Sequence, residues 1–171
     1  MKKIFLIVAT SLLSLAAVAQ PKFAHVNFAE NSELRRLGIY TFVNCGLSEI
    51  TIPTSVEGMA QYVFYNCSNL RKVTFEKNSK LTYMAAYVFA DTNIEQISFE
   101  EGSALTDLQA HAFDGAYQLK SIDFGDAKLE TIDNYAFYDC DKLEKIVLPD
   151  TVSYIGRYAF YNCFQRYLKD T

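Results

Sequence analysis

Apolar residues recur along this chain at intervals of 22 to 25 residues. Each copy of the pattern is marked by a phenylalanine, and the positions five and eight residues before it are apolar in every copy. The six marking residues are Phe42, Phe64, Phe89, Phe113, Phe137 and Phe160. Self-similarity at such a period is typical of proteins built from stacked structural repeats, in which each copy contacts only its neighbours.

A second block in each copy has the alternation of a short β-strand. In "LRKVTF" (Leu70–Phe75) and "LEKIVL" (Leu143–Leu148), the first, fourth and sixth residues are apolar. Since side chains alternate along a strand, the fourth and sixth residues point to one side and the residue between them points away. The segment before each phenylalanine predicts a second short extended stretch, which is followed by a turn or a single helical turn.

Stacking of the copies would bury apolar side chains that a single repeat cannot bury alone. Equivalent residues of successive copies would then lie about 4.8 Å apart, which is the spacing of strands in a sheet. Phe113 is therefore expected to be buried between neighbouring phenylalanines. We predict one solenoid over residues 34–163, made mostly of short parallel β-strands with short helical or 3-10 turns between them.

One repeat has a recognisable consensus. The unit "LEKIVLPDTVSYIGRYAFYNC" (Leu143–Cys163) resembles the leucine-rich repeats of the BspA-like bacterial surface proteins, whose pattern is L-x-x-I-x-L-P-x-x-V-x-x-I-G-x-x-A-F-x-x-C. Ile50–Cys67 is a second close match, while Thr92 and Ala116 stand in the cysteine place of two middle copies. The resemblance implies a leucine-rich-repeat solenoid of six repeats. It also implies an exported protein that attaches to host or microbial partners, and it supplies no catalytic residues.

The N-terminal residues have the order of a secretory signal peptide. Two lysines precede an apolar run over Ile4–Leu15, and small residues follow up to Ala19. We expect residues 1–19 to be a signal peptide, so that the mature chain begins at Gln20. The apolar run is shorter than the roughly 20 residues that span a membrane. The sequence therefore predicts an exported chain, secreted, periplasmic or on the cell surface, whose mature form has no membrane span.

The two ends of the repeat array differ from its middle. Residues 20–33 contain Phe23, Val26 and Phe28 and are expected to form an N-terminal cap over the first repeat. Residues 164–171 are expected to be an irregular tail, because Arg166 stands where the pattern requires a leucine. Two interpretations of this tail remain open: an unusual cap, or a chain that is a shortened relative of longer proteins.

The charge of the chain disfavours nucleic acid as a partner. Without Lys2 and Lys3 of the expected signal peptide, 14 basic and 20 acidic residues remain, a net charge of −6. Binding to phosphate backbones requires clustered basic residues, whereas the Lys and Arg residues here stand singly or in pairs. We expect the partners to be extracellular or surface-exposed proteins.

The four cysteines are Cys45, Cys67, Cys140 and Cys163, and they form two pairs in adjacent copies. Stacking would bring the Cα atoms of each pair within the roughly 4.4–6.8 Å that a disulfide requires. Equivalent positions of parallel copies, however, point their Cβ atoms the same way. This arrangement fits poorly with the Cβ–S–S–Cβ torsion near 90° that a disulfide requires. We therefore predict four reduced cysteines in the core. No Cys-x-x-Cys or histidine cluster accompanies them, so no metal or other cofactor is expected.

Three classes of function remain to be weighed. An enzyme is disfavoured, because no insertion longer than about two residues interrupts the repeats to hold an active site. The only histidines, His25 and His111, lie far apart in the sequence. The regular outward surface favours a protein-binding module. The alternative is a truncated or purely structural repeat fragment with no ligand of its own.

The strand block supplies the first candidate binding surface. Its outward position carries mostly small side chains, and basic residues lie beside it. The outward residues are Thr51, Thr74, Ser98, Asp123 and Val147, and the basic residues beside them are Arg71, Lys72, Lys120 and Lys145. In solenoids the regular strand wall is commonly the extended binding surface. This surface would suit an extended polypeptide better than a small molecule, which prefers an apolar pocket.

Tyrosines supply the alternative surface. They fill two positions of the repeat, one located two residues before the phenylalanine and one directly after it. The first set is Tyr40, Tyr62, Tyr87, Tyr135 and Tyr158, and the second is Tyr65, Tyr138 and Tyr161. One interpretation is stacking between repeats, with hydroxyls that reach water. The other is an aromatic recognition strip centred on Tyr62, Tyr87, Tyr135 and Tyr158.

Overall fold

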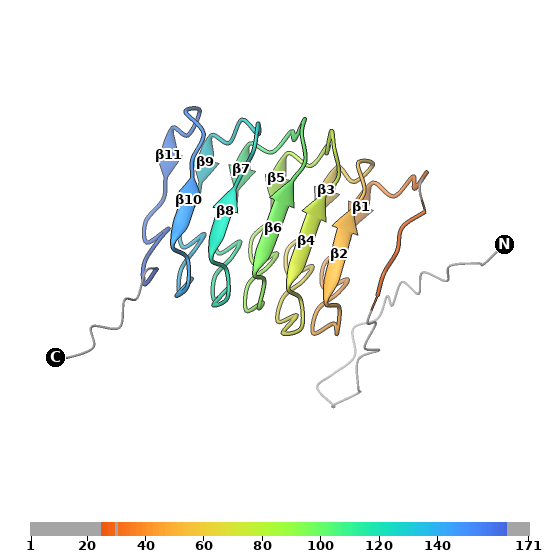
Figure 1. The fold of residues 1–171 in the computed structure, drawn as a ribbon, viewed down its shortest axis with the longest axis horizontal. Coiled ribbons are helices and arrows are strands. Elements are labelled where there is room, and N and C mark those ends of the chain that lie inside the picture. Colours follow the sequence, from red (N-terminus) through yellow and green to blue (C-terminus); the bar gives the residue numbers. More distant parts are fainter. Residues whose placement is uncertain (1–24, 30, 164–171) are drawn as a thin grey trace.

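The computed structural model describes residues 25–29 and 31–163, which form a solenoid of stacked parallel strands (Figure 1). On one side of the solenoid, each turn contributes a strand of three or four residues. These strands are β2 (Glu49–Ile52), β4 (Lys72–Phe75), β6 (Gln96–Phe99), β8 (Ser121–Asp123) and β10 (Lys145–Val147). They arise from the alternating second block of each repeat, as the sequence predicts.

The other side of the solenoid carries strands of only two residues. They lie directly before the turns that contain the marking phenylalanines. These strands are β1 (Arg36–Leu37), β3 (Gly58–Met59), β5 (Tyr83–Met84), β7 (Asp107–Leu108), β9 (Thr131–Ile132) and β11 (Tyr154–Ile155). The prediction of a second short extended stretch in every copy is confirmed, and with it the leucine-rich-repeat type of solenoid.

The strand register repeats from turn to turn, so equivalent residues of the sequence copies lie opposite one another. β2, β4 and β6 form one parallel sheet, in which Ile50 is opposite Val73 and Val73 is opposite Ile97. In β2 the side chain of Ile50 is buried and that of Thr51 is exposed. The predicted inward and outward positions are therefore correct.

A ladder of phenylalanine rings runs through the core. Ring centroids of successive turns lie 5.3, 5.2, 5.4, 5.1 and 5.2 Å apart from Phe42 to Phe160. The ring of Phe113 is fully buried between its two neighbours, as expected. A second, shorter ladder joins Phe75 to Phe99 at 5.0 Å. Stacked aromatic pairs contribute roughly 0.5–1.5 kcal/mol beyond the burial of their area.

The segments that carry the marking phenylalanines are turns, and no helix occurs among residues 25–29 and 31–163. This corrects the expectation of a helical turn. Each turn contains two residues with left-handed backbone, such as Tyr62 at φ 61° and Asn66 at φ 56°. Such a conformation costs about 1–3 kcal/mol for a non-glycine residue. Hydrogen bonds between turns offset this cost, for example from the Asn66 N–H to the Ala90 carbonyl at 3.0 Å.

All four cysteines are free of disulfide bonds in this structure. Three of the thiols donate hydrogen bonds to the phenylalanine carbonyl of the preceding turn. These contacts are Cys67 Sγ to Phe42 O at 2.8 Å, Cys140 Sγ to Phe113 O at 3.2 Å and Cys163 Sγ to Phe137 O at 3.0 Å. Each thiol therefore serves as a buried or half-buried donor for a carbonyl inside the solenoid.

Thiol reactivity tests this arrangement. Burial raises the pKa of the Cys67 thiol to about 12. The hydrogen bond with Cys140 lowers the pKa of Cys163, which is only half-buried. Because the thiolate is the reactive form, alkylation of the native protein near about pH 8 should modify Cys163 first and leave Cys67 protected. Mass spectrometry of the alkylated peptides measures this order, and equal rates at the two cysteines would contradict it.

A second measurement counts the thiols. Denatured protein that has never been treated with a reductant should react with four equivalents of a thiol reagent, one for each cysteine. Two reactive thiols or none would show that disulfides form in the oxidised protein.

The structure describes part of the expected N-terminal cap. Val26 and Phe28 are half-buried and pack against the hydrophobic core. The full extent of the cap stays a prediction. The expected signal peptide, residues 1–19, and the expected tail, residues 164–171, lie outside the described residues.

Candidate functional site

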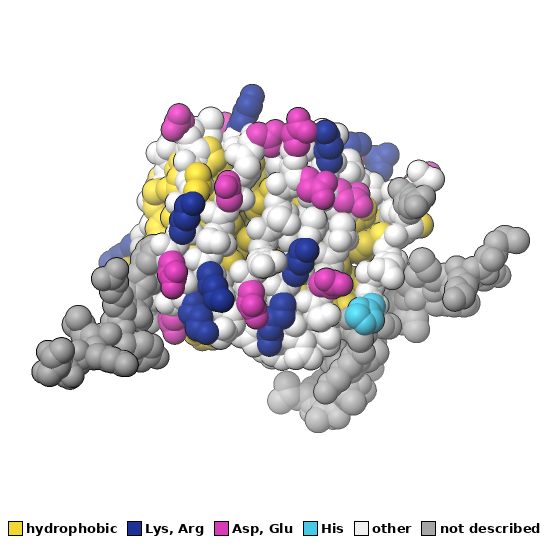
Figure 2. All heavy atoms as spheres, viewed as in Figure 1, with side chains coloured by type: hydrophobic (Ala, Val, Ile, Leu, Met, Phe, Trp, Pro, Cys, Tyr) yellow, Lys and Arg dark blue, Asp and Glu magenta, His cyan; other side chains and the backbone are white. Residues whose placement is uncertain are grey.

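The outward side of the longer strands forms a continuous surface, which we call the strand face. It comprises the exposed residues of β2, β4, β6, β8 and β10, together with Arg71 and Lys120, which directly precede β4 and β8. Figure 2 shows this face, on which acidic and basic side chains are intermixed. Hydrophobic atoms gather toward the end that carries β10 and β11.

The predicted row of small side chains lies along this face. Register places Thr51 opposite Thr74 and Thr74 opposite Ser98. The Ser98 hydroxyl donates a hydrogen bond to Thr74 Oγ1 at 3.3 Å. On the next two strands the row continues with Asp123, which lies opposite Val147. The structure thus brings all five predicted outward residues onto one face.

The predicted basic residues divide into two groups. Lys72 lies in β4 opposite Glu49 of β2, and Lys145 lies in β10 opposite Ser121 of β8. Lys120 is exposed beside β8. Arg71, in contrast, is engaged by its own chain. Lys72 lies two residues before Thr74 and Lys120 three residues before Asp123, and their part in binding stays a prediction.

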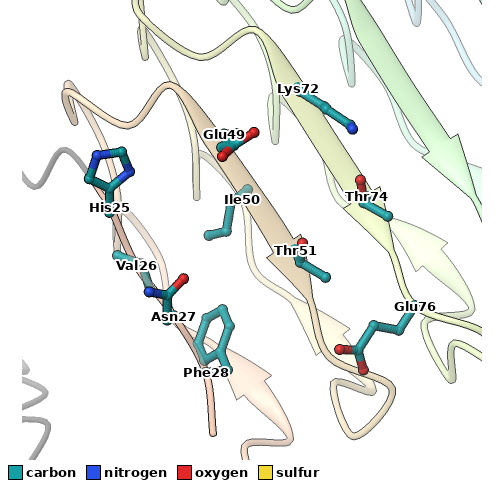
Figure 3. Close-up of a pocket in the computed structure, with 10 residues that line it drawn as sticks. All are labelled: His25, Val26, Asn27, Phe28, Glu49, Ile50, Thr51, Lys72, Thr74 and Glu76. Atoms are coloured by element: carbon teal, nitrogen blue, oxygen red, sulfur yellow. The ribbon is translucent and has the colours of Figure 1, made fainter. Parts of the chain in front are cut away.

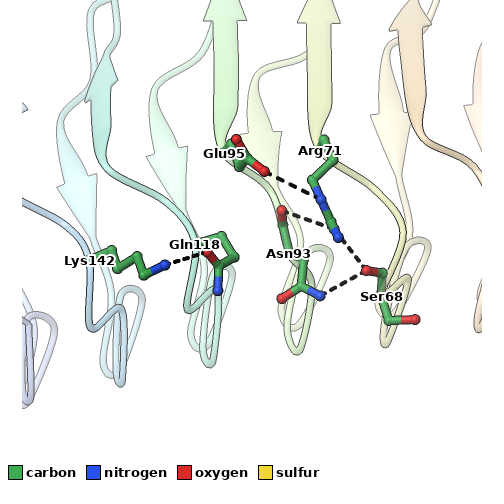
Figure 4. Close-up of polar contacts among 6 residues, drawn as sticks. All are labelled: Ser68, Arg71, Asn93, Glu95, Gln118 and Lys142. Carbon is green, nitrogen blue, oxygen red and sulfur yellow. Dashed lines mark hydrogen bonds and ion pairs between the residues drawn. The ribbon is translucent and has the colours of Figure 1, made fainter.

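Arg71 connects adjacent turns of the solenoid (Figure 4). Its Nε atom lies 3.4 Å from a carboxylate oxygen of Glu95. Its Nη1 atom donates to the carbonyl oxygens of Ser68 at 2.8 Å and Asn93 at 3.4 Å. A guanidinium with these partners contributes mainly to the local structure, so the lysines are the better candidates for contact with a ligand.

A cavity of about 240 Å³ lies at the N-terminal end of the strand face. It forms where residues 25–28 run beside β2 (Figure 3). The residues around it are His25, Val26, Asn27, Phe28, Glu49, Ile50, Thr51, Lys72, Thr74 and Glu76. Thr51, Lys72 and Thr74 are predicted site residues, whereas the contribution of the N-terminal segment was not predicted. The apolar Phe23, Val26 and Phe28 were the sequence signal that this segment covers the first repeat.

The first tyrosine position forms a continuous stack along the solenoid. Successive ring centroids lie 5.2, 4.9, 4.5, 4.7 and 5.3 Å apart. The six rings are those of Tyr40, Tyr62, Tyr87, His111, Tyr135 and Tyr158. The rings therefore stack between turns, with His111 in the place of one ring, and whether they also form a recognition strip stays a prediction.

The second tyrosine position meets this stack at a steep angle. The ring of Tyr65 is inclined by 86° to that of Tyr62, and the ring of Tyr161 by 88° to that of Tyr158. Tyr138 stacks on Tyr161 at 5.2 Å. The two sets of rings, which we call the tyrosine wall, therefore form a corner.

Carboxylates lie among these rings. A hydrogen bond to the Asp91 carboxylate raises the pKa of Tyr65, so this phenol stays neutral. The Asp114 carboxylate lies 2.7 Å from Nδ1 of His111. Burial raises the pKa of Asp114, although its contact with His111 opposes this effect. The tyrosine wall therefore combines neutral ring faces with acidic groups.

In the part of the chain that the structure describes, no group of three or more His, Cys, Asp or Glu side chains could hold a metal ion. His25 lies beside β2 and His111 in the tyrosine stack. Over the same residues, none of the elements is a helix of the length and apolarity needed to cross a membrane.

Comparison with protein families gives a match over most of the chain. Residues 35–167 match the profile of the BspA type leucine rich repeat region in six copies. A search of curated proteins gave no match.

Three solved structures have the same fold. A leucine rich cell surface protein from Faecalibacterium prausnitzii is 22% identical, with a TM-score of 0.64 over 82% of this chain. A leucine-rich repeat protein from Eubacterium ventriosum is 24% identical, with a TM-score of 0.63 over 72% of this chain. The leucine rich repeat protein of T. pallidum is 26% identical, with a TM-score of 0.58 over 67% of this chain. The chain spans 38%, 32% and 54% of these three proteins, respectively.

Proposed function

This chain belongs to the family of BspA type leucine rich repeat proteins, and from this premise we propose that it is an exported module that binds other proteins along its strand face. Repeat solenoids of this kind generally act by binding, because their stacked turns create extended surfaces. The proposed partners are proteins on host or microbial surfaces.

The observation that carries the proposal is the aligned row of Thr51, Thr74 and Ser98. Small side chains in register let the backbone of an extended polypeptide approach the sheet over several turns. Lys72 and Lys120 lie on the same face and would attract acidic groups of such a partner. The cavity beside β2 offers a recess at one end of this track for one larger side chain.

The proposal of export rests on the N-terminal sequence and on the family. The order of lysines, apolar residues and small residues up to Ala19 supports cleavage before Gln20. One relative of the same fold is a cell surface protein from Faecalibacterium prausnitzii. N-terminal sequencing of protein recovered outside the cytoplasm should begin at Gln20, and a start at Met1 would contradict processing by signal peptidase.

Charge reversal on the strand face tests where the partner binds. Extended acidic peptides selected from a display library against the full chain would serve as probes. We expect Lys72→Glu combined with Lys120→Glu to slow association at low salt by about tenfold or more and to weaken its salt dependence. Surface plasmon resonance at several salt concentrations measures both effects, and circular dichroism shows that the variant is folded.

The matched control reverses the charge of two other lysines, which lie away from the strand face. Lys80 and Lys128 are exposed in the loops that follow β4 and β8, so Lys80→Glu combined with Lys128→Glu should leave association nearly unchanged. Equal slowing by both double variants would show only a general effect of net charge. Loss of binding on substitution of Tyr62, Tyr87 and Tyr135 alone would place the site on the tyrosine wall. Failure to select any peptide would favour the alternative of a structural fragment.

A further inference from the structure

Four tyrosines line an open hollow of about 280 Å³ on the last two turns of the described solenoid. Tyr135 and Tyr138 lie in the turn after β9, and Tyr158 and Tyr161 in the turn after β11. Tyr135 and Tyr158 are 5.3 Å apart and form one side, while Tyr138 and Tyr161 are 5.2 Å apart and form the other. The rings of Tyr158 and Tyr161 meet at 88° and those of Tyr135 and Tyr138 at 58°, so the two sides form a corner.

The faces of these rings attract positive charge. An aromatic ring carries negative charge density on its face, and a cation within about 6 Å of its centre is stabilised. The chain itself already makes one such contact, because Arg157 Cζ lies 4.9 Å from the centre of the Tyr158 ring, and a cation bound on that face would have to displace this guanidinium. Tyr158 and Tyr161 are 43% and 53% exposed, so a ligand can reach them from solvent.

Acidic residues lie near Tyr138, although none of them lines the hollow. Asp139 directly follows Tyr138 and accepts a hydrogen bond from Asn162 Nδ2 at 2.8 Å, which fixes the carboxylate. Asp141 lies two residues further on and is half-buried. Desolvation and the nearby Asp139 carboxylate raise the pKa of Tyr138, so its phenol stays neutral at physiological pH. The hollow is therefore aromatic on its walls, and the Asp139 carboxylate lies near Tyr138.

We propose that this four-tyrosine pocket binds an organic ammonium group, and that a trimethylammonium group is the form that fits it best. A quaternary ammonium donates no hydrogen bond, so ring faces can replace its water shell without an acceptor for each N–H group. Its methyl groups would contact the two walls, and the nearby Asp139 carboxylate would offset its charge. The site lies on the tyrosine wall and is independent of the strand face.

The other tyrosine corner of the chain lacks this enclosure. Tyr62 and Tyr65 also meet at a right angle. The residues equivalent to Tyr65 in the turns on either side are Val43 and Ala90, however, so no second ring extends that wall. The Tyr65 hydroxyl is also engaged with Asp91. The chain therefore offers an internal comparison between a complete and an incomplete pocket.

Titration with choline, and with its uncharged analogue 3,3-dimethylbutanol, tests the proposal on the full chain. The two molecules have nearly the same shape, so their difference reports the positive charge. We expect choline to bind about 3- to 30-fold more tightly, as a cation–π contribution of about 0.5–2 kcal/mol implies. Chemical shift changes of the tyrosine ring protons would follow binding and locate it. Equal affinity for both molecules, or no binding of choline, would overturn the proposal.

Variants distinguish the pocket from the rest of the aromatic surface. Tyr161→Ala removes one wall from an exposed position of the last turn and should weaken choline binding about tenfold, whereas Tyr158→Phe keeps the ring and should bind normally. Tyr62→Ala at the incomplete corner should also bind normally. Unchanged binding by a folded Tyr161→Ala variant would overturn the assignment of the site.

Two further ligands distinguish the sources of the trimethylammonium group. Phosphocholine represents lipid or polysaccharide decoration, and an acetylated trimethyl-lysine amide represents a modified protein. Binding of either ligand at the four-tyrosine pocket supports the proposal. The ligand with the higher affinity identifies the source of the trimethylammonium group. Because the strand-face variants Lys72→Glu and Lys120→Glu leave this pocket intact, they should not change choline affinity. Failure of the strand-face proposal would therefore leave this result unaffected.

Discussion

Replacing Phe113 by alanine is expected to lower the free energy of unfolding by about 3–5 kcal/mol. The Phe113 ring is fully buried and lies 5.4 Å from the ring of Phe89 and 5.1 Å from that of Phe137. Its removal would leave a cavity in the middle of the ladder and break two stacked contacts at once. The turns are held by their neighbours, so the surrounding backbone has little freedom to collapse into the space.

Equilibrium unfolding in urea, followed by circular dichroism, measures this loss. Lys128→Ala provides the control, because this side chain is exposed in the loop after β8 and should change stability by less than about 0.5 kcal/mol. A loss for Phe113→Ala as small as that of the control would show that the ring is not part of a packed core. The slope of the unfolding free energy against urea concentration should be compared in both variants. A repeat protein can lose cooperativity when a middle turn is weakened, and this would change the slope.

Replacing Thr92 by valine is expected to lower the free energy of unfolding by about 1–3 kcal/mol. Thr92 occupies the cysteine position of its repeat and is 1% exposed. Its hydroxyl donates to the Phe89 carbonyl at 2.7 Å. Valine keeps the shape of threonine but has no donor, so the buried carbonyl would lose this partner. The expected loss is large for a change that removes no volume.

A second substitution provides the test of mechanism. In other turns a cysteine donates to the phenylalanine carbonyl of the preceding turn, as Cys140 does to Phe113. Ala116 occupies that position for Phe89 and has no donor, which explains why Thr92 supplies one from within its own turn. Ala116→Cys should therefore recover part of the stability that Thr92→Val loses. Additive effects of the two changes in urea unfolding would show that they do not share the Phe89 carbonyl.

The strands of the fold were predictable because alternation is a local property of the chain. The apolar fourth and sixth residues of "LSEITI" identify Ile50 and Ile52 as inward, and both are buried in β2. The two-residue strands were predicted less firmly, since they are too short to show a period of their own. The left-handed backbone of Tyr62 was not predictable, because a bulky residue rarely adopts it and hydrogen bonds to the next turn sustain it here.

The candidate surfaces were predicted only in part. The outward row with Thr51 and Thr74 follows from the repeat, and its alignment in the sheet is confirmed. The role of Arg71 could not be predicted, because its partner Glu95 lies in the next turn. The cavity beside β2 was missed for the same reason, since it needs the N-terminal segment to lie against a strand that is distant in the sequence.

The sequence by itself determined the repeat period, the inward residues of each turn and therefore the solenoid. These features are properties of residues a few positions apart, and six copies of the pattern reinforce them. Only the tertiary structure decided which atoms of neighbouring turns meet. The thiol of Cys67 reaches a carbonyl 25 residues earlier, and the rings of Tyr135 and Tyr158 form one wall across two turns. Such contacts depend on the rise and rotation between stacked turns, which no local pattern specifies.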